Sequence, residues 1–266
     1  MNILEVNDLR KVYTTRFGSQ SVEALRAVTF AVEEGEFVAV MGESGSGKTT
    51  LMNMIAGIYY PDSGEIQVDE KPAEIRSPKD AYALGIGMVH QHFKLIDVFT
   101  AVENIALVMD QHEKYDLKAI RQKAREICDR YAFDIDLDQK VYEMSVSQKQ
   151  TLEIIKMLYR GAQILILDEP TNGLDPSGIH EIRNLVKSLP SLYDCTVLIS
   201  SHMLSEIELI ADDIGILNHG RLLFEGSMND LRQYALQSGF AADNLEDVFL
   251  SMVEKDNMDR KQRAKL

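Results

Sequence analysis

The stretch that decides the fold is Gly42-Glu43-Ser44-Gly45-Ser46-Gly47-Lys48-Thr49, which matches the pattern G-x-x-x-x-G-K-[ST] at every fixed position. An apolar run, FVAVM at 37–41, precedes it, and TTLMNMIA at 49–56 is able to open a helix. A plain glycine-rich turn lacks this strand–loop–helix context. The glycines let backbone N–H groups turn inward around phosphate oxygens, and the helix N-terminus adds its dipole. The sequence therefore predicts a cradle for the phosphates of a nucleotide.

Two side chains of this cradle are expected to act on the nucleotide directly. Lys48 is expected to bridge the β- and γ-phosphates, and the Thr49 hydroxyl is expected to ligate Mg²⁺. ATP and Mg²⁺ are accordingly the expected cofactors. The residues of the cradle that are expected to bind ATP are Gly42, Glu43, Ser44, Gly45, Ser46, Gly47, Lys48, Thr49 and Thr50.

A second decisive stretch is the aliphatic run ILIL at 164–167, which is followed by Asp168 and Glu169. Four aliphatic side chains in a row indicate a strand that is buried on both faces. Asp168 at its end is placed to hold the Mg²⁺ shell, and Glu169 is placed to polarise an attacking water as a general base. An Asp-Glu pair after a strand can also be an exposed turn, but the cradle elsewhere in the chain favours the catalytic interpretation.

Strand-like and helix-like runs alternate along the chain, which predicts a parallel-rich sheet flanked by helices. Residues 97–160 are mostly helical and interrupt this order, so we predict a helical subdomain inserted into a core of residues 1–96 and 161–240. Residues 241–266 are expected to form a C-terminal helix and a frayed end, because the tail DNMDRKQRAKL is polar and aperiodic.

Composition argues against several classes of protein. The 266 residues carry a net charge of −14, which opposes binding to nucleic acid and adsorption to anionic lipid. No apolar run is long enough for a membrane span, and the N-terminus MNILEVNDLRKVY lacks a signal pattern. Cys128 and Cys195 lie far apart without a C-x-x-C motif, so they are expected to be reduced thiols of a cytosolic protein. If it works at a membrane, such a chain is expected to dock on another protein.

Further short motifs stand in a fixed order around the Asp-Glu strand. Gln91 follows the strand-like run IGMVH, the stretch MSVSQ at 144–148 precedes the Asp-Glu strand, and GLD at 173–175 and SSH at 200–202 come after it. The guanine-reading motif N-K-x-D is absent, which weakens the case for a GTPase. This ordered set resembles the ATP-binding cassette (ABC) family, and the resemblance spans nearly the whole chain.

The resemblance implies a role for each of these residues. Tyr13 matches the aromatic residue that stacks on adenine, and Gln91 matches the loop glutamine that senses Mg²⁺ and the lytic water and couples to the membrane subunit. The stretch Ser145-Val146-Ser147-Gln148 matches the signature that caps the ATP held by the other protomer. Asp175 matches the loop that contacts the partner across the dimer, and His202 matches the histidine that holds the γ-phosphate and the water.

Both lines of inference combine in one expected site. The expected Mg²⁺ ligands are Thr49, Gln91 and Asp168, and the expected catalytic residues are Lys48, Gln91, Glu169 and His202. The alternatives are a core aromatic for Tyr13, a loop amide for Gln91 and an ordinary histidine for His202. His90 and His92 suggest a metal pair, but the further ligands that a metal site needs are missing from the pattern.

The resemblance also implies a fold and partners. The expected fold is an α/β P-loop NTPase with a parallel-rich core sheet, an antiparallel β subdomain and the inserted helical subdomain. A homodimer, or a heterodimer with another cassette, is expected to sandwich two ATP molecules and to power separate transmembrane permease subunits. The chain is then cytoplasmic and peripheral on the inner face of the cell membrane, without inserting into it. A soluble ABC ATPase that acts on ribosomes or DNA is an alternative, which the net acidity disfavours.

Three stretches resemble different branches of the family. Residues 1 to about 62 resemble macrolide- and lipoprotein-type export ATPases, and residues from about 75 to 169 resemble nucleoside- and simple-sugar import ATPases. Residues 170 to about 250 resemble bacitracin-type antibiotic-export ATPases. We therefore expect a recombinant chain, natural or constructed, and a cassette without a native permease is a further alternative.

The signature itself departs from the usual LSGGQ. Val146 and Ser147 replace its two glycines, and Met144 replaces its leucine. The import branch carries similar variants, so the stretch is expected to remain a nucleotide signature. Val146 is the larger departure, because a β-branched side chain stands where a glycine faces the dimer seam.

Overall fold

The computed structural model describes residues 1–14, 21–109, 114–193, 195–238 and 244–263. Its core is a six-stranded sheet in the order β10-β9-β3-β8-β7-β6, in which β10 alone is antiparallel to its neighbour. The strands are β3 (Phe37–Met41), β6 (Ile86–Val89), β7 (Ile164–Asp168), β8 (Thr196–Ser201), β9 (Asp213–Asn218) and β10 (Arg221–Ser227). Every residue of β3, β6, β7 and β8 is buried, because helices or a second sheet cover both faces. The α/β P-loop fold is thereby confirmed.

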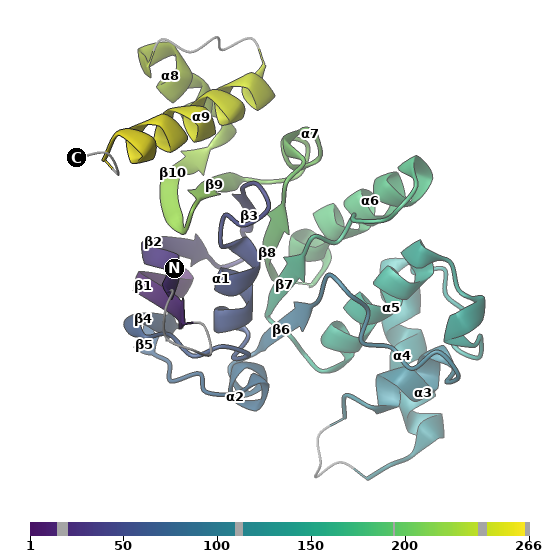
Figure 1. The fold of residues 1–266 in the computed structure, drawn as a ribbon. Helices are drawn as coiled ribbons and strands as arrows, with labels where there is room; N and C mark the ends of the chain where they lie inside the picture. Colours follow the sequence, from purple (N-terminus) through teal and green to yellow (C-terminus); the bar gives the residue numbers. More distant parts are fainter. Residues whose placement is uncertain (15–20, 110–113, 194, 239–243, 264–266) are drawn as a thin grey trace.

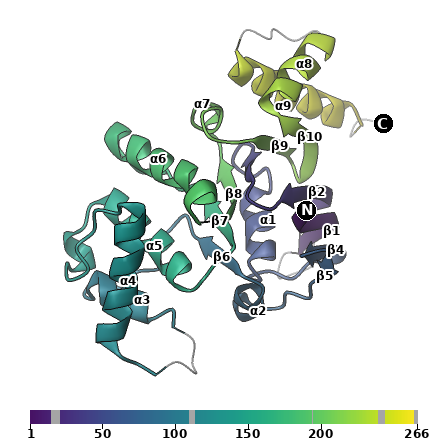
Figure 2. The ribbon, with the colours of Figure 1, turned by 180° about the vertical axis from the view of Figure 1, so that it is seen from behind.

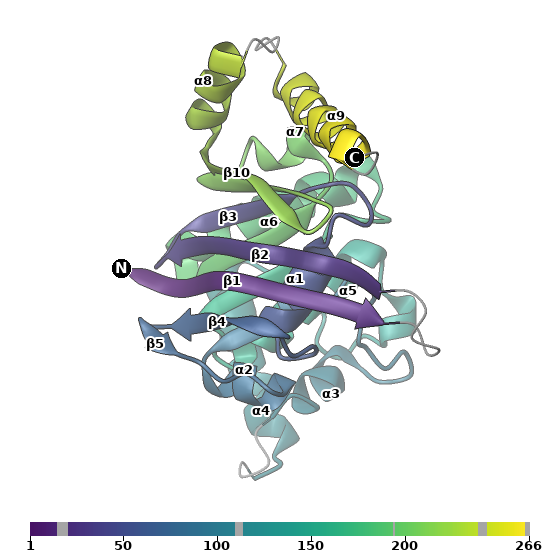
Figure 3. The same cartoon turned by 60° about the vertical axis from the view of Figure 1, so that its left-hand side comes forward.

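A second, antiparallel sheet has the order β2-β1-β4-β5 and crosses in front of helix α1 (Figure 3). Its strands are β1 (Asn2–Thr14), β2 (Ser21–Glu33), β4 (Ser63–Val68) and β5 (Lys71–Pro72). Helix α1 (Lys48–Ile55) lies between the two sheets, where its apolar residues join one cluster with both of them. Helix α2 (Pro78–Ala83) leads into β6. Because α1 begins at the predicted nucleotide cradle, its packing against the two sheets holds the cradle in place from both sides.

The opposite face of the core sheet is covered by C-terminal helices and α6. They are α6 (Pro176–Tyr193), α7 (Leu204–Ile207), α8 (Met228–Ser238) and α9 (Leu245–Arg263). The structure corrects the expected frayed end over residues 256–263, since α9 is helical to Arg263; the rest of that expected end, 264–266, lies outside the described residues. The cause is tertiary: Asn218 donates to Asp256 (2.9 Å), and His219 bonds to Asn257 (2.9 Å).

The helices between β6 and β7 form a separate body that stands away from the antiparallel sheet, as Figures 1 and 2 show from opposite sides. They are α3 (Ala101–Ala106), α4 (Leu117–Tyr131), the 3₁₀ turn η1 (Val141–Glu143) and α5 (Val146–Tyr159). These elements share a hydrophobic cluster of their own, built around Ile105, Ile120 and Leu152. The exact division at residues 97 and 160 stays a prediction.

Both cysteines are buried free thiols, Cys128 in the helical cluster and Cys195 in the core. Burial raises the pKa of Cys128 to about 11 and that of Cys195 to about 12. In the described ranges, no helix combines the length and the apolar character that crossing a bilayer requires.

Candidate functional site

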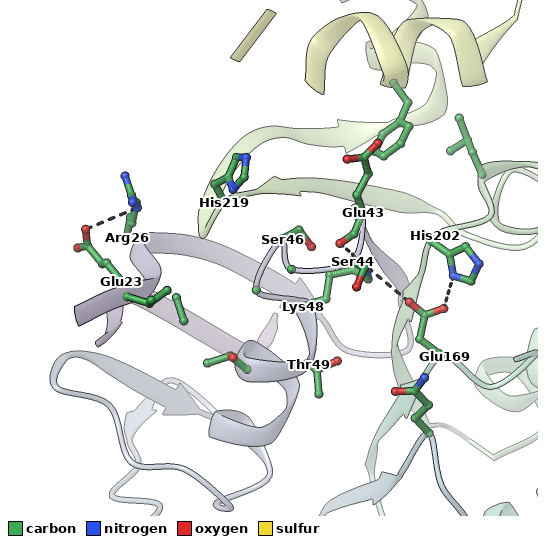
Figure 4. A pocket seen from close by; sticks show the side chains of 18 of the residues that line it. Glu23, Arg26, Glu43, Ser44, Ser46, Lys48, Thr49, Glu169, His202 and His219 are labelled. Atoms are coloured by element: carbon green, nitrogen blue, oxygen red, sulfur yellow. Dashed lines mark hydrogen bonds and ion pairs between the residues drawn. The ribbon is translucent and has the colours of Figure 1, made fainter. Parts of the chain in front are cut away.

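The carboxyl ends of three strands meet at one cavity of about 910 Å³. β3 runs into the loop 42–47 and then α1, β7 ends at Asp168, and β8 leads to His202. Because β7 pairs with β8 and β8 pairs with β3 in parallel, the three loops emerge side by side. Figure 4 shows side chains from each of them pointing into the same space. This edge of a parallel sheet is where open α/β folds bind ligands.

The cradle depends on glycine for its backbone shape. Gly47 has φ of 108°, and a Cβ there would lie 2.6 Å from the carbonyl oxygen of Ala24. Gly42 has no room either, because a Cβ would strike the carbonyl of Leu217 and the side chain of Ser46. At Gly47, only glycine allows both the close approach to the Ala24 carbonyl and the left-handed conformation.

Donor groups in the cradle are left open. Helix α1 begins after Gly47, and within the described chain no side chain caps its first N–H groups. The hydroxyl of Ser46 is buried and has no hydrogen-bond partner among the residues that the structure describes. Buried polar groups are nearly always satisfied, so the Ser46 hydroxyl and the start of α1 suit an anionic ligand such as a phosphate.

Lys48 supplies the positive charge at the floor of the cavity. Its side chain is buried, and its ammonium donates to the carbonyl oxygens of Gly42 and Glu43. It also lies 3.4 Å from a carboxylate oxygen of Glu169. The ammonium is therefore held between the loop and the acidic end of β7, where it can neutralise a bound phosphate.

A pair of oxygen ligands suits a small divalent cation. The Thr49 hydroxyl lies 3.4 Å from Asp168 Oδ1, which also accepts a hydrogen bond from Ser200. Burial raises the pKa of the Asp168 carboxyl, while the bond from Ser200 acts in the opposite direction. Hydroxyl and carboxylate oxygens are the donors that Mg²⁺ prefers, so these two side chains fit the expected ion.

Glu169 is the most constrained acid of the site. Its φ is 50°, a left-handed conformation that is rare outside glycine, and its N–H is fixed by the carbonyl and hydroxyl oxygens of Ser200 (both 3.1 Å). His202 Nδ1 lies 2.6 Å from one carboxylate oxygen, and Lys48 approaches the other (Figure 4). The carboxylate is thus aimed into the cavity between two basic groups.

The rim of the cavity contains residues that were expected and residues that were not. Tyr13 and Gln91 line it, as do all the cradle residues from Glu43 to Thr50. The sequence did not predict that α9 closes one side, where Glu246, Phe249, Leu250 and Arg260 join the lining. The run LEDVFL carries a helical apolar spacing, but no local pattern indicates where that helix packs.

The signature lies elsewhere. Within the described chain, neither Ser145–Gln148 nor Asp175 belongs to the cavity lining. Ser145 caps α5: its hydroxyl accepts from Gln148 N (3.1 Å), and Gln148 Oε1 accepts from Ser145 N (2.9 Å). Val146 is exposed, and Asp175 accepts from Gly178 N (2.9 Å). Their roles toward a partner's ATP stay predictions.

The loop after Gln91 is fastened to α5 by a buried ion pair. Glu153 accepts from the backbone N–H of Lys94, and Lys156 donates to the carbonyl of the same residue (3.0 Å). Glu153 and Lys156 lie 2.9 Å apart, and both side chains are about 5% exposed or less. The loop that carries Gln91 is therefore held in place by the same helix, α5, that begins at the signature.

The fold and this site define a P-loop nucleotide-binding cassette. The chain belongs to the ABC transporter family, whose pattern matches residues 25–172. This membership confirms the expected class, an ATP-hydrolysing cassette with ATP and Mg²⁺ as its cofactors. A solved dimeric ATP-binding cassette in a post-hydrolysis state, bound to ADP and Pi, shares 27% identity at a TM-score of 0.73 and covers 85% of this chain and 98% of its own.

Curated relatives extend over more of the chain than the family pattern. The nucleoside import ATP-binding protein NupA of Lactococcus lactis subsp. cremoris is 41% identical over 219 residues, which is 82% of this chain and 43% of that protein. The guanosine import ATP-binding protein NupO of Bacillus subtilis is 42% identical over 189 residues, 70% of this chain and 36% of that protein. The chain spans less than half the length of these relatives. Such continuous likeness to import proteins does not support the expected recombination of three branches.

Proposed function

We propose that this chain is the ATP-hydrolysing cassette of a transporter that imports a nucleoside or a simple sugar. The observation that carries the hydrolytic part is the Glu169 carboxylate, which faces the cavity between Lys48 and His202. The import part rests on the likeness to nucleoside and guanosine import proteins. Composition and motifs alone leave the transported molecule open, and this likeness narrows the proposal to nucleosides and simple sugars.

The residues expected to be catalytic or to bind Mg²⁺ each have a part in hydrolysis. Lys48 and the N–H groups of α1 bind the β- and γ-phosphates and neutralise charge as it develops. Thr49 and Asp168, with Gln91, would hold a magnesium ion, whose positive charge would neutralise charge on the phosphate oxygens. Glu169 accepts the proton of the attacking water, and His202 orients the carboxylate and reaches toward the γ-phosphate.

The remaining expected residues act between protomers. Tyr13 stacks on the adenine ring, and the signature Ser145-Val146-Ser147-Gln148 caps the ATP that the opposite cradle holds. Asp175 contacts the partner across the dimer. A homodimer or a heterodimer of cassettes docks through the region of Gln91 and the helical subdomain, residues 97–160, on permease subunits at the inner face of the membrane.

Replacing Glu169 by glutamine tests the hydrolytic role. We expect Glu169→Gln to bind ATP normally, to lose turnover by about 100-fold or more, and to accumulate as a closed dimer. Steady-state ATPase assays and size-exclusion chromatography with ATP measure both effects. Glu246→Gln is the matched control, since it removes a carboxylate from the α9 side of the same cavity. Normal hydrolysis by Glu169→Gln would remove Glu169 from the base role.

The ATP-trapped Glu169→Gln protein also serves to find the partner. Recovery of a permease with bound cassette from a membrane fraction supports transport, and uptake assays with nucleosides and simple sugars then identify the cargo. Recovery with ribosomes or DNA instead supports the soluble ABC ATPase. Turnover in wild type without any membrane partner supports a cassette that has no native permease.

A further inference from the structure

The ring of Tyr13 has an aromatic neighbour that no sequence motif indicates. The rings of Tyr13 and Tyr59 lie 5.8 Å apart between centroids and are inclined by 80°, an edge-to-face contact. Tyr13 lines the nucleotide cavity, while Tyr59 is not among the residues that line it within the described chain. Tyr59 therefore contacts the Tyr13 ring without itself lining the cavity.

Tyr59 belongs to the short segment 58–62 that follows α1. The backbone N–H groups of Ile58 and Tyr59 donate to the carbonyl of Asn53 in α1, at 2.8 and 3.2 Å. Helix α1 begins at the phosphate cradle, so the position of Tyr59 is set by the same helix that presents its N-terminus to the phosphates. The segment thus continues the phosphate-binding element toward the base-binding end of the cavity.

The other side of this segment is bonded to the strand that carries Tyr13. Lys11 Nζ donates to the Tyr60 carbonyl (2.7 Å) and to Asp62 (3.0 Å), and it lies 5.9 Å from the centroid of the Tyr13 ring. The N–H of Val12 donates to the other Asp62 oxygen (2.6 Å). The bonds from Lys11 and Val12, the two residues that precede Tyr13, therefore hold the register between the segment and the strand.

We propose that Tyr59 is a positioning residue that fixes the Tyr13 ring for stacking on the base, and that segment 58–62 links this ring to the phosphate cradle through α1. The proposal rests on the proposed role of Tyr13. An edge-to-face contact contributes about as much as a three- to tenfold change in an equilibrium constant. Without it, the Tyr13 ring loses its fixed orientation, while Lys48 and Glu169 keep theirs.

The first test compares three variants of the full chain. We expect Tyr59→Leu to raise the KM for ATP about three- to tenfold with kcat unchanged, because binding of the base is weakened equally in the ground state and in the transition state. Tyr59→Phe keeps the ring edge and is expected to restore the wild-type KM. Tyr60→Leu is the matched control: it removes the neighbouring ring, which packs near Arg76 (5.7 Å) rather than near Tyr13. Urea unfolding of each variant separates a folding defect from a binding effect.

A double-variant cycle decides whether Tyr59 acts through Tyr13. In a Tyr13→Leu background, Tyr59→Leu is expected to cause no further rise in KM, since the ring that it orients is gone. An equal rise in both backgrounds would overturn the proposal, as would an unchanged KM in Tyr59→Leu alone. If the wild-type chain binds ATP but does not hydrolyse it, the proposed function fails; equilibrium binding of a fluorescent ATP analogue then gives the same comparison as a Kd.

Discussion

The two helices expected to face one ATP molecule from opposite protomers begin in contrasting ways. Helix α1 starts after Gly47 in a left-handed conformation, and in the described structure no side chain caps its N–H groups. Helix α5 starts at Ser145, whose capping box with Gln148 satisfies both backbone groups reciprocally. The N-terminus of α1 can therefore donate to a ligand, whereas the N-terminus of α5 is capped by side chains of its own helix.

The contrast separates two ways of stabilising a helix terminus. Packing between two sheets holds α1 in place, so its donors are free for phosphate oxygens. Helix α5 has its own cap and a buried ion pair further along, so its shape does not depend on nucleotide. We infer that the cradle becomes fully satisfied only with ATP, whereas the signature helix is preformed.

The largest expected effect comes from breaking the internal support of α5. Lys156→Met leaves the Glu153 carboxylate buried without its partner, which is expected to lower the free energy of unfolding by about 3–5 kcal/mol. Urea unfolding without nucleotide measures this. Lys149→Met on the same helix is the control, since its ion pair with Asp97 spans 3.8 Å and the Asp97 side chain is 70% exposed. Equal stability of the two variants would show that α5 does not rely on its buried pair.

A smaller effect is expected from closing the open start of α1. Gly47→Ala forces a Cβ against the carbonyl of Ala24 at a left-handed φ, so we expect ATP affinity to fall about 30-fold, or about 2 kcal/mol. Titration with a fluorescent ATP analogue measures the loss. Gly161→Ala provides the control: its φ is 85°, and nothing lies within 4 Å of the added Cβ. Unchanged ATP affinity in Gly47→Ala would contradict the inference that the N-terminus of α1 binds the phosphates of ATP.

The smallest expected effect comes from removing the cap of α5. Ser145→Ala is expected to lower the free energy of unfolding by about 1 kcal/mol, the usual contribution of an N-cap side chain. Ser147→Ala removes a hydroxyl from the same turn without touching the bonds to Gln148, so it is expected to cost less. Chemical denaturation of both variants, with and without ATP, makes the comparison. A stability loss that appears only with ATP would mean that Ser145 acts on nucleotide rather than on its own helix.

Sequence reasoning found those parts of the site that local order determines. The cradle, the Asp168-Glu169 pair and His202 each lie at or directly after the carboxyl end of a strand, so their convergence follows from a parallel sheet. Sequence reasoning missed the features that depend on contacts between residues far apart in the chain. Residues 256–263 are polar and aperiodic, yet they stay helical because Asp256 and Asn257 bond to the β9–β10 turn. The buried pair Glu153–Lys156 was equally invisible, since charges three residues apart on a helix usually face solvent.

The two buried thiols give the chain a practical property. With pKa values of about 11 and 12, fewer than about one in a thousand of these groups is ionised near neutral pH, and both are shielded from reagents. Maleimide chemistry on the native protein therefore has a low background. A cysteine introduced at the exposed Val98 or Met258 is then the site that takes a dye, so fluorescence can test the proposed dimer closure in a chain that keeps its own cysteines.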